Sequence, residues 1–130
     1  MTYYRRNIDQ KLLEWKDSPR RKPLLIRGAR QVGKSSAVRH FAKCFKYFVE
    51  VNLERQPSIR QLFTKDIDVK RTCEDISAST GIPIVAGKTL LFIDEIQVSQ
   101  EGIMSLRYFK EDYPELHVIA AGSLLEFTLE

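Results

Sequence analysis

One short stretch, LIRGARQVGKSS at residues 25–36, restricts the possible folds of this chain more than any other. Gly28 and Gly33 stand five positions apart and are followed at once by Lys34 and Ser35, which completes the pattern G-x-x-x-x-G-K-[ST]. Glycine tolerates the tight turns that bring backbone N–H groups against phosphate oxygens. The predicted phosphate-binding residues are Gly28, Ala29, Arg30, Gln31, Val32, Gly33, Lys34, Ser35 and Ser36.

The residues on either side of this loop have the pattern of a strand followed by a helix. Apolar residues precede it at Leu24–Arg27, and residues of Lys34–Phe45 recur at helical spacing. The positive end of that helix is expected to face the phosphates, with Lys34 at the β- and γ-phosphates and Ser35 as a ligand of Mg²⁺. The alternative is a glycine turn that precedes a lysine by chance.

Further strands and helices alternate along the rest of the chain. Two runs, TLLFID and HVIAA, are almost continuously apolar, which indicates burial on both faces of a parallel sheet. Residues 47–53 alternate instead, which favours an edge strand with one partly wet face. The predicted strands are Leu24–Arg27, Tyr47–Leu53, Thr89–Asp94 and His117–Ala121, and the predicted helices are residues 5–16, Lys34–Phe45, Ser58–Thr64, Asp68–Ala78 and Glu101–Tyr113. This order predicts a three-layer α/β/α fold whose ligand lies beyond the carboxyl ends of the strands.

An acidic pair, Asp94-Glu95, closes the apolar run TLLFID. Two carboxylates at the end of a buried strand are unfavourable unless a cation lies beside them. We expect Asp94 to act on Mg²⁺ through water and Glu95 to polarise the water that attacks the γ-phosphate. A solvated strand end is the alternative when the pair is considered without the phosphate loop.

Gly122 and Ser123 follow the strand predicted at His117–Ala121. Two roles are open for the Ser123 hydroxyl: it senses the γ-phosphate, or it caps a helix that begins in the following residues, LLEF.

Composition limits the other possibilities. A chain of 130 residues is the size of one domain, and its net charge of +4 is too small to argue for nucleic acid by itself. No stretch resembles a membrane span or a secretory signal, so we expect a cytoplasmic protein. Cys44 and Cys73 are far apart and are interpreted as free thiols.

The segments RKPLLIRGARQVGKSS, FVEVNLE, TLLFIDEIQ and SLRYFKEDYPELHVIAAGSLLEF together closely resemble the prokaryotic AAA-like P-loop ATPases. The resemblance covers the chain from about Tyr4 to its end. It implies an ATP- and Mg²⁺-binding core of sheet order 5-1-4-3-2, with the metal on Ser35 and Asp94. It also implies catalytic roles for Lys34 and Glu95, and a sensor role for Ser123.

Members of that family are longer, and they carry a fifth strand, a helical lid and a further C-terminal domain. The resemblance therefore implies an N-terminal helix and basic linker at residues 1–23 and an incomplete core at residues 24–130. Without the fifth strand, the strand Leu24–Arg27 becomes a sheet edge. We expect the N-terminal segment to cover that edge, or two copies of the chain to associate through it.

Three functions stay open at this stage: an ATPase, a nucleotide-binding module with little turnover of its own, and an ATP-driven component of a DNA-associated or defence system. The third is motivated by the net charge, the basic cluster Arg20-Arg21-Lys22 and the C-terminal domain that the resemblance implies. For the basic cluster, a solvated loop is the alternative. Arg107 is the candidate arginine finger, although a solvated helix face explains it as well. The segment Tyr3–Arg5 is considered for contact with adenine, against a core or edge position.

Overall fold

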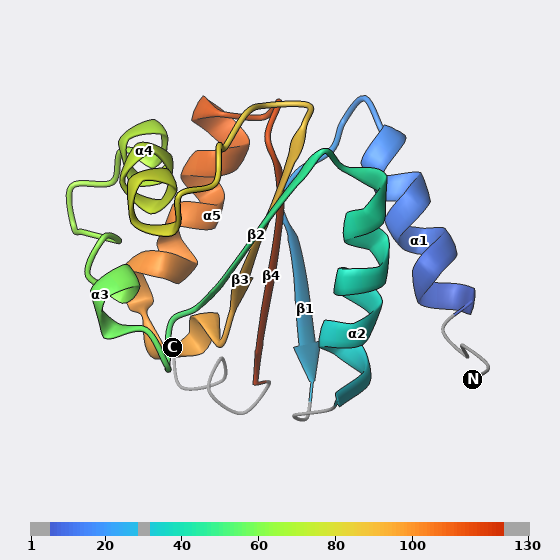
Figure 1. Cartoon of the computed structure of the whole chain (residues 1–130), viewed down its shortest axis with the longest axis horizontal. Coiled ribbons are helices and arrows are strands. Elements are labelled where there is room, and N and C mark those ends of the chain that lie inside the picture. Colours follow the sequence, from blue (N-terminus) through green and yellow to red (C-terminus); the bar gives the residue numbers. More distant parts are fainter. Residues whose placement is uncertain (1–5, 29–31, 124–130) are drawn as a thin grey trace.

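The computed structural model describes residues 6–28 and 32–123, with residues 6, 7, 28, 32–34 and 123 described by their backbone alone. A central parallel sheet is covered by helices on both faces (Figure 1). In chain order the elements are α1 (Arg6–Asp17), β1 (Leu24–Gly28), α2 (Val32–Phe41), η1 (Ala42–Cys44), β2 (Tyr47–Asn52), α3 (Pro57–Arg60), α4 (Val69–Thr80), β3 (Thr89–Asp94), η2 (Ile96–Val98), α5 (Gln100–Asp112) and β4 (His117–Ser123), where η marks a short 3-10 helix.

The four described strands lie in the order β1-β4-β3-β2, and all of their pairings are parallel. This confirms the α/β class, the predicted order of strands 1-4-3-2, and the edge position of β2. The register pairs Gly28 with Ser123, and Asn52 with Asp94. Because the strands are parallel, their carboxyl ends meet at one edge of the sheet.

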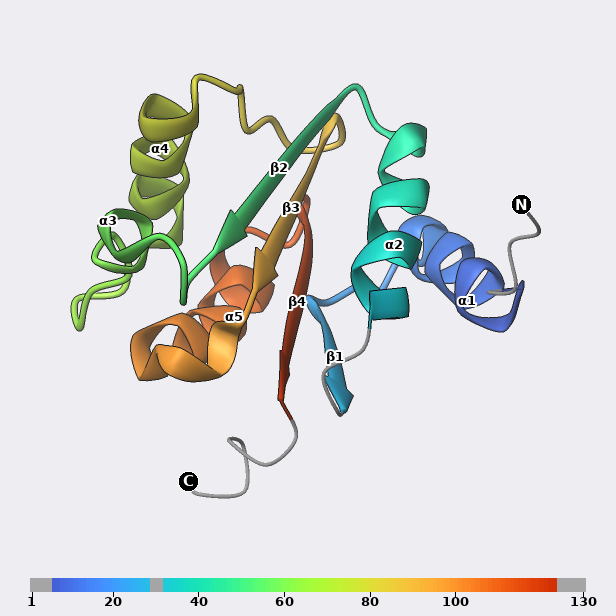
Figure 2. The ribbon, with the colours of Figure 1, turned by 60° about the horizontal axis from the view of Figure 1, so that its bottom comes forward.

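Side chains of the sheet alternate between two separate cores. Leu90 and Phe92 of β3 pack with α1 and α2 on one face, whereas Leu91 and Ile93 pack with α3, α4 and α5 on the other (Figure 2). Residues Thr89–Ile93 are all completely buried, as the continuous apolar run predicts.

Several element boundaries differ from the prediction. The helix predicted at Ser58–Thr64 is a single turn, because the N–H groups of Leu62 and Phe63 bond to carbonyls three residues back and tighten the chain. The helix after the loop begins at Val32 and ends at Phe41, and η1 takes up its predicted last turn. Strand β4 continues to Ser123 because it pairs with β1 over its whole length beyond Val118.

The N-terminal segment packs on the face of the sheet beside α2. Leu12 of α1 is fully buried, and it joins the cluster that contains Leu24 and Ile26 of β1. Trp15 fixes the linker by donating from Nε1 to the carbonyl of Lys22 at 2.6 Å. Among the described residues, no strand pairs with the outer side of β1, so its coverage by another chain stays a prediction.

Arg21 of the basic cluster is bound to the protein itself. Its Nη1 donates to the carbonyl of Lys16, and its Nη2 donates to the carbonyls of Pro114 and Glu115, at 3.0–3.1 Å. Desolvation lowers the pKa of this guanidinium, and Glu115 partly offsets the effect. Arg21 thereby ties the linker to the loop between α5 and β4.

No helix in residues 6–28 and 32–123 combines the length and the hydrophobicity that crossing a bilayer requires.

Candidate functional site

The strand and the helix that the glycine-rich pattern requires are both present. β1 ends at Gly28 and α2 begins at Val32, so the N-terminus of α2 lies at the carboxyl end of β1 (Figure 1). Ala29, Arg30 and Gln31 lie outside the described residues. The backbone of the first turn of α2 includes Gly33 and Lys34; Ser35 follows half-buried, and Ser36 is exposed.

The acidic pair lies where the chain leaves β3. Asp94 is half-buried, and its Oδ1 accepts a hydrogen bond from the backbone N–H of Glu95 at 2.9 Å. Glu95 has a φ of 53°, the only left-handed conformation of a non-glycine residue in the described chain. Such a conformation costs about 1–3 kcal/mol and tends to persist where function requires it. Here it turns the chain from the strand into η2.

Asp94 sits among groups that make its negative charge unfavourable. Its pKa is raised first by desolvation, and then by repulsion from Glu95 and Glu50. The bond from the Glu95 N–H and the charge of Arg39 oppose this shift without cancelling it. Among the described residues no cation forms an ion pair with Asp94. A carboxylate in this state favours an incoming cation.

Glu95 is held by a neighbour that the sequence did not single out. The amide Nε2 of Gln97, in η2, donates to Oε1 of Glu95 at 2.8 Å. This hydrogen bond orients the carboxylate. The signal available in the sequence was only the position of Gln97, two residues beyond the acidic pair.

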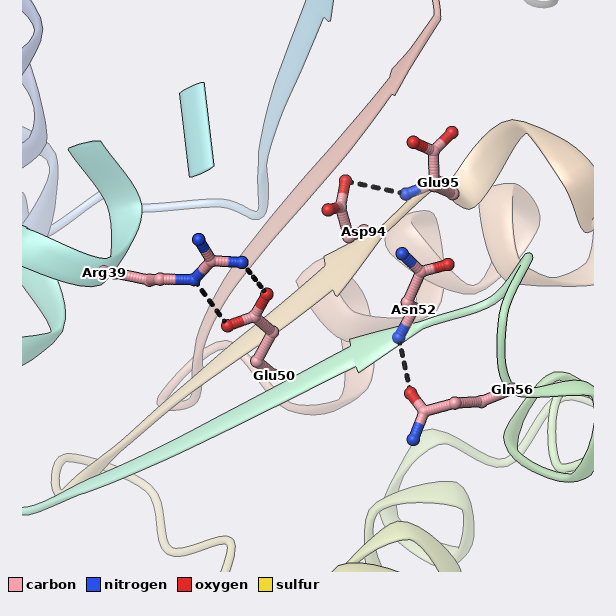
Figure 3. Close-up of polar contacts among 6 residues, drawn as sticks. All are labelled: Arg39, Glu50, Asn52, Gln56, Asp94 and Glu95. Atoms are coloured by element: carbon pink, nitrogen blue, oxygen red, sulfur yellow. Dashed lines mark hydrogen bonds and ion pairs between the residues drawn. The ribbon is translucent and has the colours of Figure 1, made fainter. Parts of the chain in front are cut away.

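The end of β2 contributes a second wall, which the sequence analysis also missed. Oδ1 of Asn52 accepts from the backbone N–H groups of Glu54 and Arg55. The backbone N–H of Asn52 donates to Oε1 of Gln56 at 2.8 Å (Figure 3). These bonds fix the loop that follows the strand. The alternation of β2, with Glu50 and Asn52 on its wet face, was the signal that could have found them.

A cavity of about 520 Å³ lies between these walls. It is lined by Arg39, Glu50, Asn52, Glu54, Arg55, Gln56, Asp94 and Glu95. Its lining is charged and polar, which suits a hydrated, charged ligand or cation better than an apolar one.

Arg39 and Glu50 form a bidentate ion pair inside this cavity. Nε of Arg39 donates to Oε1 of Glu50 at 3.0 Å, and Nη2 donates to Oε2 at 2.7 Å (Figure 3). Hydrogen bonding to Glu50 raises the pKa of Arg39.

Ser123 is placed by its backbone only. Its register with Gly28 puts it at the carboxyl end of β4, beside the last residue of β1. Its role stays a prediction, and the helix that it would cap lies outside the described residues.

The other candidates are less closely associated with the site. Arg107 donates from Nε to Oε2 of Glu111 one turn away at 3.2 Å, and both side chains are well exposed, as on a solvated helix face. Tyr3, Tyr4 and Arg5 lie outside the described residues.

The site fits Mg²⁺ that arrives with a nucleotide. The described residues contain no group of three or more histidine, cysteine, aspartate or glutamate side chains that would hold a metal by themselves. Mg²⁺ usually takes one or two protein ligands and fills its shell with phosphate oxygens and water, and Asp94 and Ser35 are the ligands predicted from the sequence.

Comparison with known proteins points to nucleotide binding. Residues 20–130 match the model of a protein family described as AAA domain. No curated protein matches the chain. An AAA domain binds a nucleotide, and the parallel sheet, the strand–loop–helix unit and the acidic strand end agree with that assignment.

Proposed function

The chain belongs to the AAA domain family, and from that premise we propose that it binds ATP together with Mg²⁺ at the carboxyl edge of the sheet and hydrolyses the bond between the β- and γ-phosphates. The observation that carries the proposal is the meeting of two features at one edge. The glycine-rich pattern begins at the end of β1, and the acidic pair lies at the end of β3. Only β4 separates these two strands in the sheet.

The loop and the first turn of α2 would hold the phosphates. Backbone N–H groups of the segment Gly28–Ser36 would donate to phosphate oxygens, supported by the positive end of α2. The Lys34 ammonium would reach the β- and γ-phosphates.

Ser35 and Asp94 would hold Mg²⁺, which when bound neutralises the phosphates and stabilises the charge that develops as the bond breaks. The raised pKa of Asp94 supports this role, because a bound cation offsets both the desolvation of the carboxylate and its repulsion from Glu95 and Glu50.

Glu95 would take the proton of the attacking water at its carboxylate. Gln97 donates to one carboxylate oxygen at 2.8 Å, which gives the Glu95 carboxylate a defined orientation. The left-handed backbone at Glu95 supports the same role, since the chain leaves the strand there and the Glu95 side chain no longer follows the alternating directions of β3. Ser123 would contact the γ-phosphate from the end of β4.

Two substitutions test binding and turnover separately. Lys34→Ala is expected to abolish ATP binding, measured by the fluorescence of a labelled ATP analogue. Glu95→Gln is expected to keep binding and to lower phosphate release by about 10²–10⁴-fold. The matched control is Glu74→Gln, at an exposed position of α4 on the opposite face of the sheet. It should change neither ATP binding nor phosphate release. Binding of ATP to the Lys34→Ala variant at wild-type strength would contradict the proposal.

We also propose that copies of this chain associate through the outer side of β1. An unpaired parallel edge recruits partners by backbone hydrogen bonding. Light scattering tests this: a concentration-dependent mass above that of one chain is expected, and a constant monomer mass would refute it.

A further inference from the structure

We propose that Glu50 is a positioning residue for the metal site: it holds the Arg39 guanidinium on β2 and keeps that cation from competing with Mg²⁺ at Asp94. The inference rests on the proposed function, because it assumes that Asp94 acts on the Mg²⁺ of bound ATP.

Arg39 comes from the helix that begins at the phosphate loop. It lies four residues after Ser35, which is one turn of α2. Its two hydrogen bonds to Glu50, at 3.0 and 2.7 Å, use both carboxylate oxygens in the planar geometry that guanidinium favours. The Glu50 side chain is only 27% exposed, so the pair is partly shielded from water.

Asp94 faces the same cavity as this pair. Asn52 pairs with Asp94 in the sheet, and Glu50 precedes Asn52 by two residues on the same face of β2. Arg39, Glu50 and Asp94 all line the cavity of about 520 Å³ (Figure 3). Arg39 attracts the Asp94 carboxylate electrostatically, while Glu50 repels it.

Removing the charge of Glu50 would leave the Arg39 cation uncompensated next to Asp94. The guanidinium would then pair with Asp94 or oppose the approach of a cation through its charge. A partly exposed ion pair of this kind is worth about 1 kcal/mol, which corresponds to a change of about fivefold in the Mg²⁺ concentration required. Replacing both members of the pair restores local neutrality and should remove the effect.

A Mg²⁺ titration of nucleotide binding tests the inference without measuring turnover. MgCl₂ is added to the protein with a fluorescent ATP analogue, and the half-saturating Mg²⁺ concentration is compared for the wild type and the variants. Glu50→Gln is expected to raise it about fivefold. The double variant Arg39→Gln/Glu50→Gln is expected to return it to within about twofold of wild type.

Glu111→Gln provides the matched control, because it removes the partner of another arginine, Arg107, on exposed α5. It should leave the Mg²⁺ midpoint unchanged, and melting curves establish that each variant is folded. An unchanged midpoint for Glu50→Gln would overturn the inference. So would a raised midpoint that the double variant fails to restore, because Glu50 would then act through its own charge.

Asp94→Asn separates this inference from the function beneath it. If wild-type binding depends on Mg²⁺ and Asp94→Asn weakens that dependence while Glu50→Gln does not, only the role of Glu50 fails. If wild-type binding is independent of Mg²⁺ or of Asp94, the proposed metal site fails and the inference fails with it.

Discussion

Replacing Asp94 by asparagine is expected to stabilise the nucleotide-free protein, although it should damage function. The carboxylate is half-buried beside Glu95 and Glu50, and its pKa is raised by desolvation. Asparagine keeps an oxygen that can accept the 2.9 Å bond from the Glu95 N–H, so only the charge is lost. Functional sites commonly carry such stability losses, and reversing one gains about 0.5–2 kcal/mol.

The lower part of that range applies because Asp94 is partly exposed and solvent screens its charge. A gain of about 0.5–1 kcal/mol corresponds to a rise in Tm of about 2–4 °C for a domain of this size. Thermal unfolding near pH 7.5, without Mg²⁺ or ATP, measures it. Asp66→Asn, at an exposed loop position, is the control and should shift Tm by less than about 2 °C.

The pH dependence gives the sign of the effect independently. Folding raises the pKa of Asp94 above its ordinary value of 3.8. Below pH 3.8 the group is protonated in both states and its charge costs no stability. The loss of stability develops as pH rises from 3.8 through the pKa of the folded state. The advantage of Asp94→Asn should therefore be complete near pH 7.5 and should shrink towards about pH 4.5. A variant less stable than wild type near pH 7.5, or one whose advantage grows on acidification, would refute the reasoning.

Three further predictions concern the rest of the fold. Arg21→Ala should lower the free energy of unfolding by about 1–3 kcal/mol in urea titrations, because it leaves carbonyls without their donors; Arg20→Ala, on the exposed neighbour, should change it by less than about 0.5 kcal/mol. Desolvation lowers the pKa of His117 below its ordinary value of 6.5, so the stability that the neutral ring confers is present above pH 6.5 and is lost as pH falls through the pKa of the folded state. His117→Phe should therefore flatten the dependence of unfolding free energy on pH in this range, and an unchanged slope would contradict the prediction. Burial raises the pKa of Cys73 to about 12, so in the native protein a thiol reagent should label exposed Cys44 rapidly and Cys73 only on unfolding.

The parts of the fold that depend on local patterns could be predicted from the sequence. Strand β3 begins and ends where the run TLLFID does. Five consecutive buried residues fit a strand that is covered on both faces, whereas a surface helix or a turn would expose some of them. The order of the strands followed from the resemblance to P-loop ATPases and agrees with the parallel pairing of β4 between β1 and β3. The acidic pair could also be found from a local pattern, because it directly follows the apolar residues of a buried strand.

The groups that hold the site in place depend on tertiary contacts, and no local pattern specified them. Arg39 and Glu50 are 11 residues apart on different elements, and only the packing of α2 on the sheet brings them together. The left-handed backbone of Glu95 is equally invisible in the sequence, because glutamate seldom adopts that conformation. The short helix α3 was overestimated because its apolar spacing continues into residues 62 and 63, where the chain tightens.

The central claim is that the glycine-rich loop and the acidic strand end form one site for Mg²⁺ and ATP. Calorimetric titration of the protein with ATP, with and without Mg²⁺, tests it most directly when wild type, Lys34→Ala and Asp94→Asn are compared. We predict saturable binding to wild type that Mg²⁺ strengthens, no binding to Lys34→Ala, and binding to Asp94→Asn that Mg²⁺ strengthens much less. Equal binding and equal Mg²⁺ dependence in all three proteins would contradict the account.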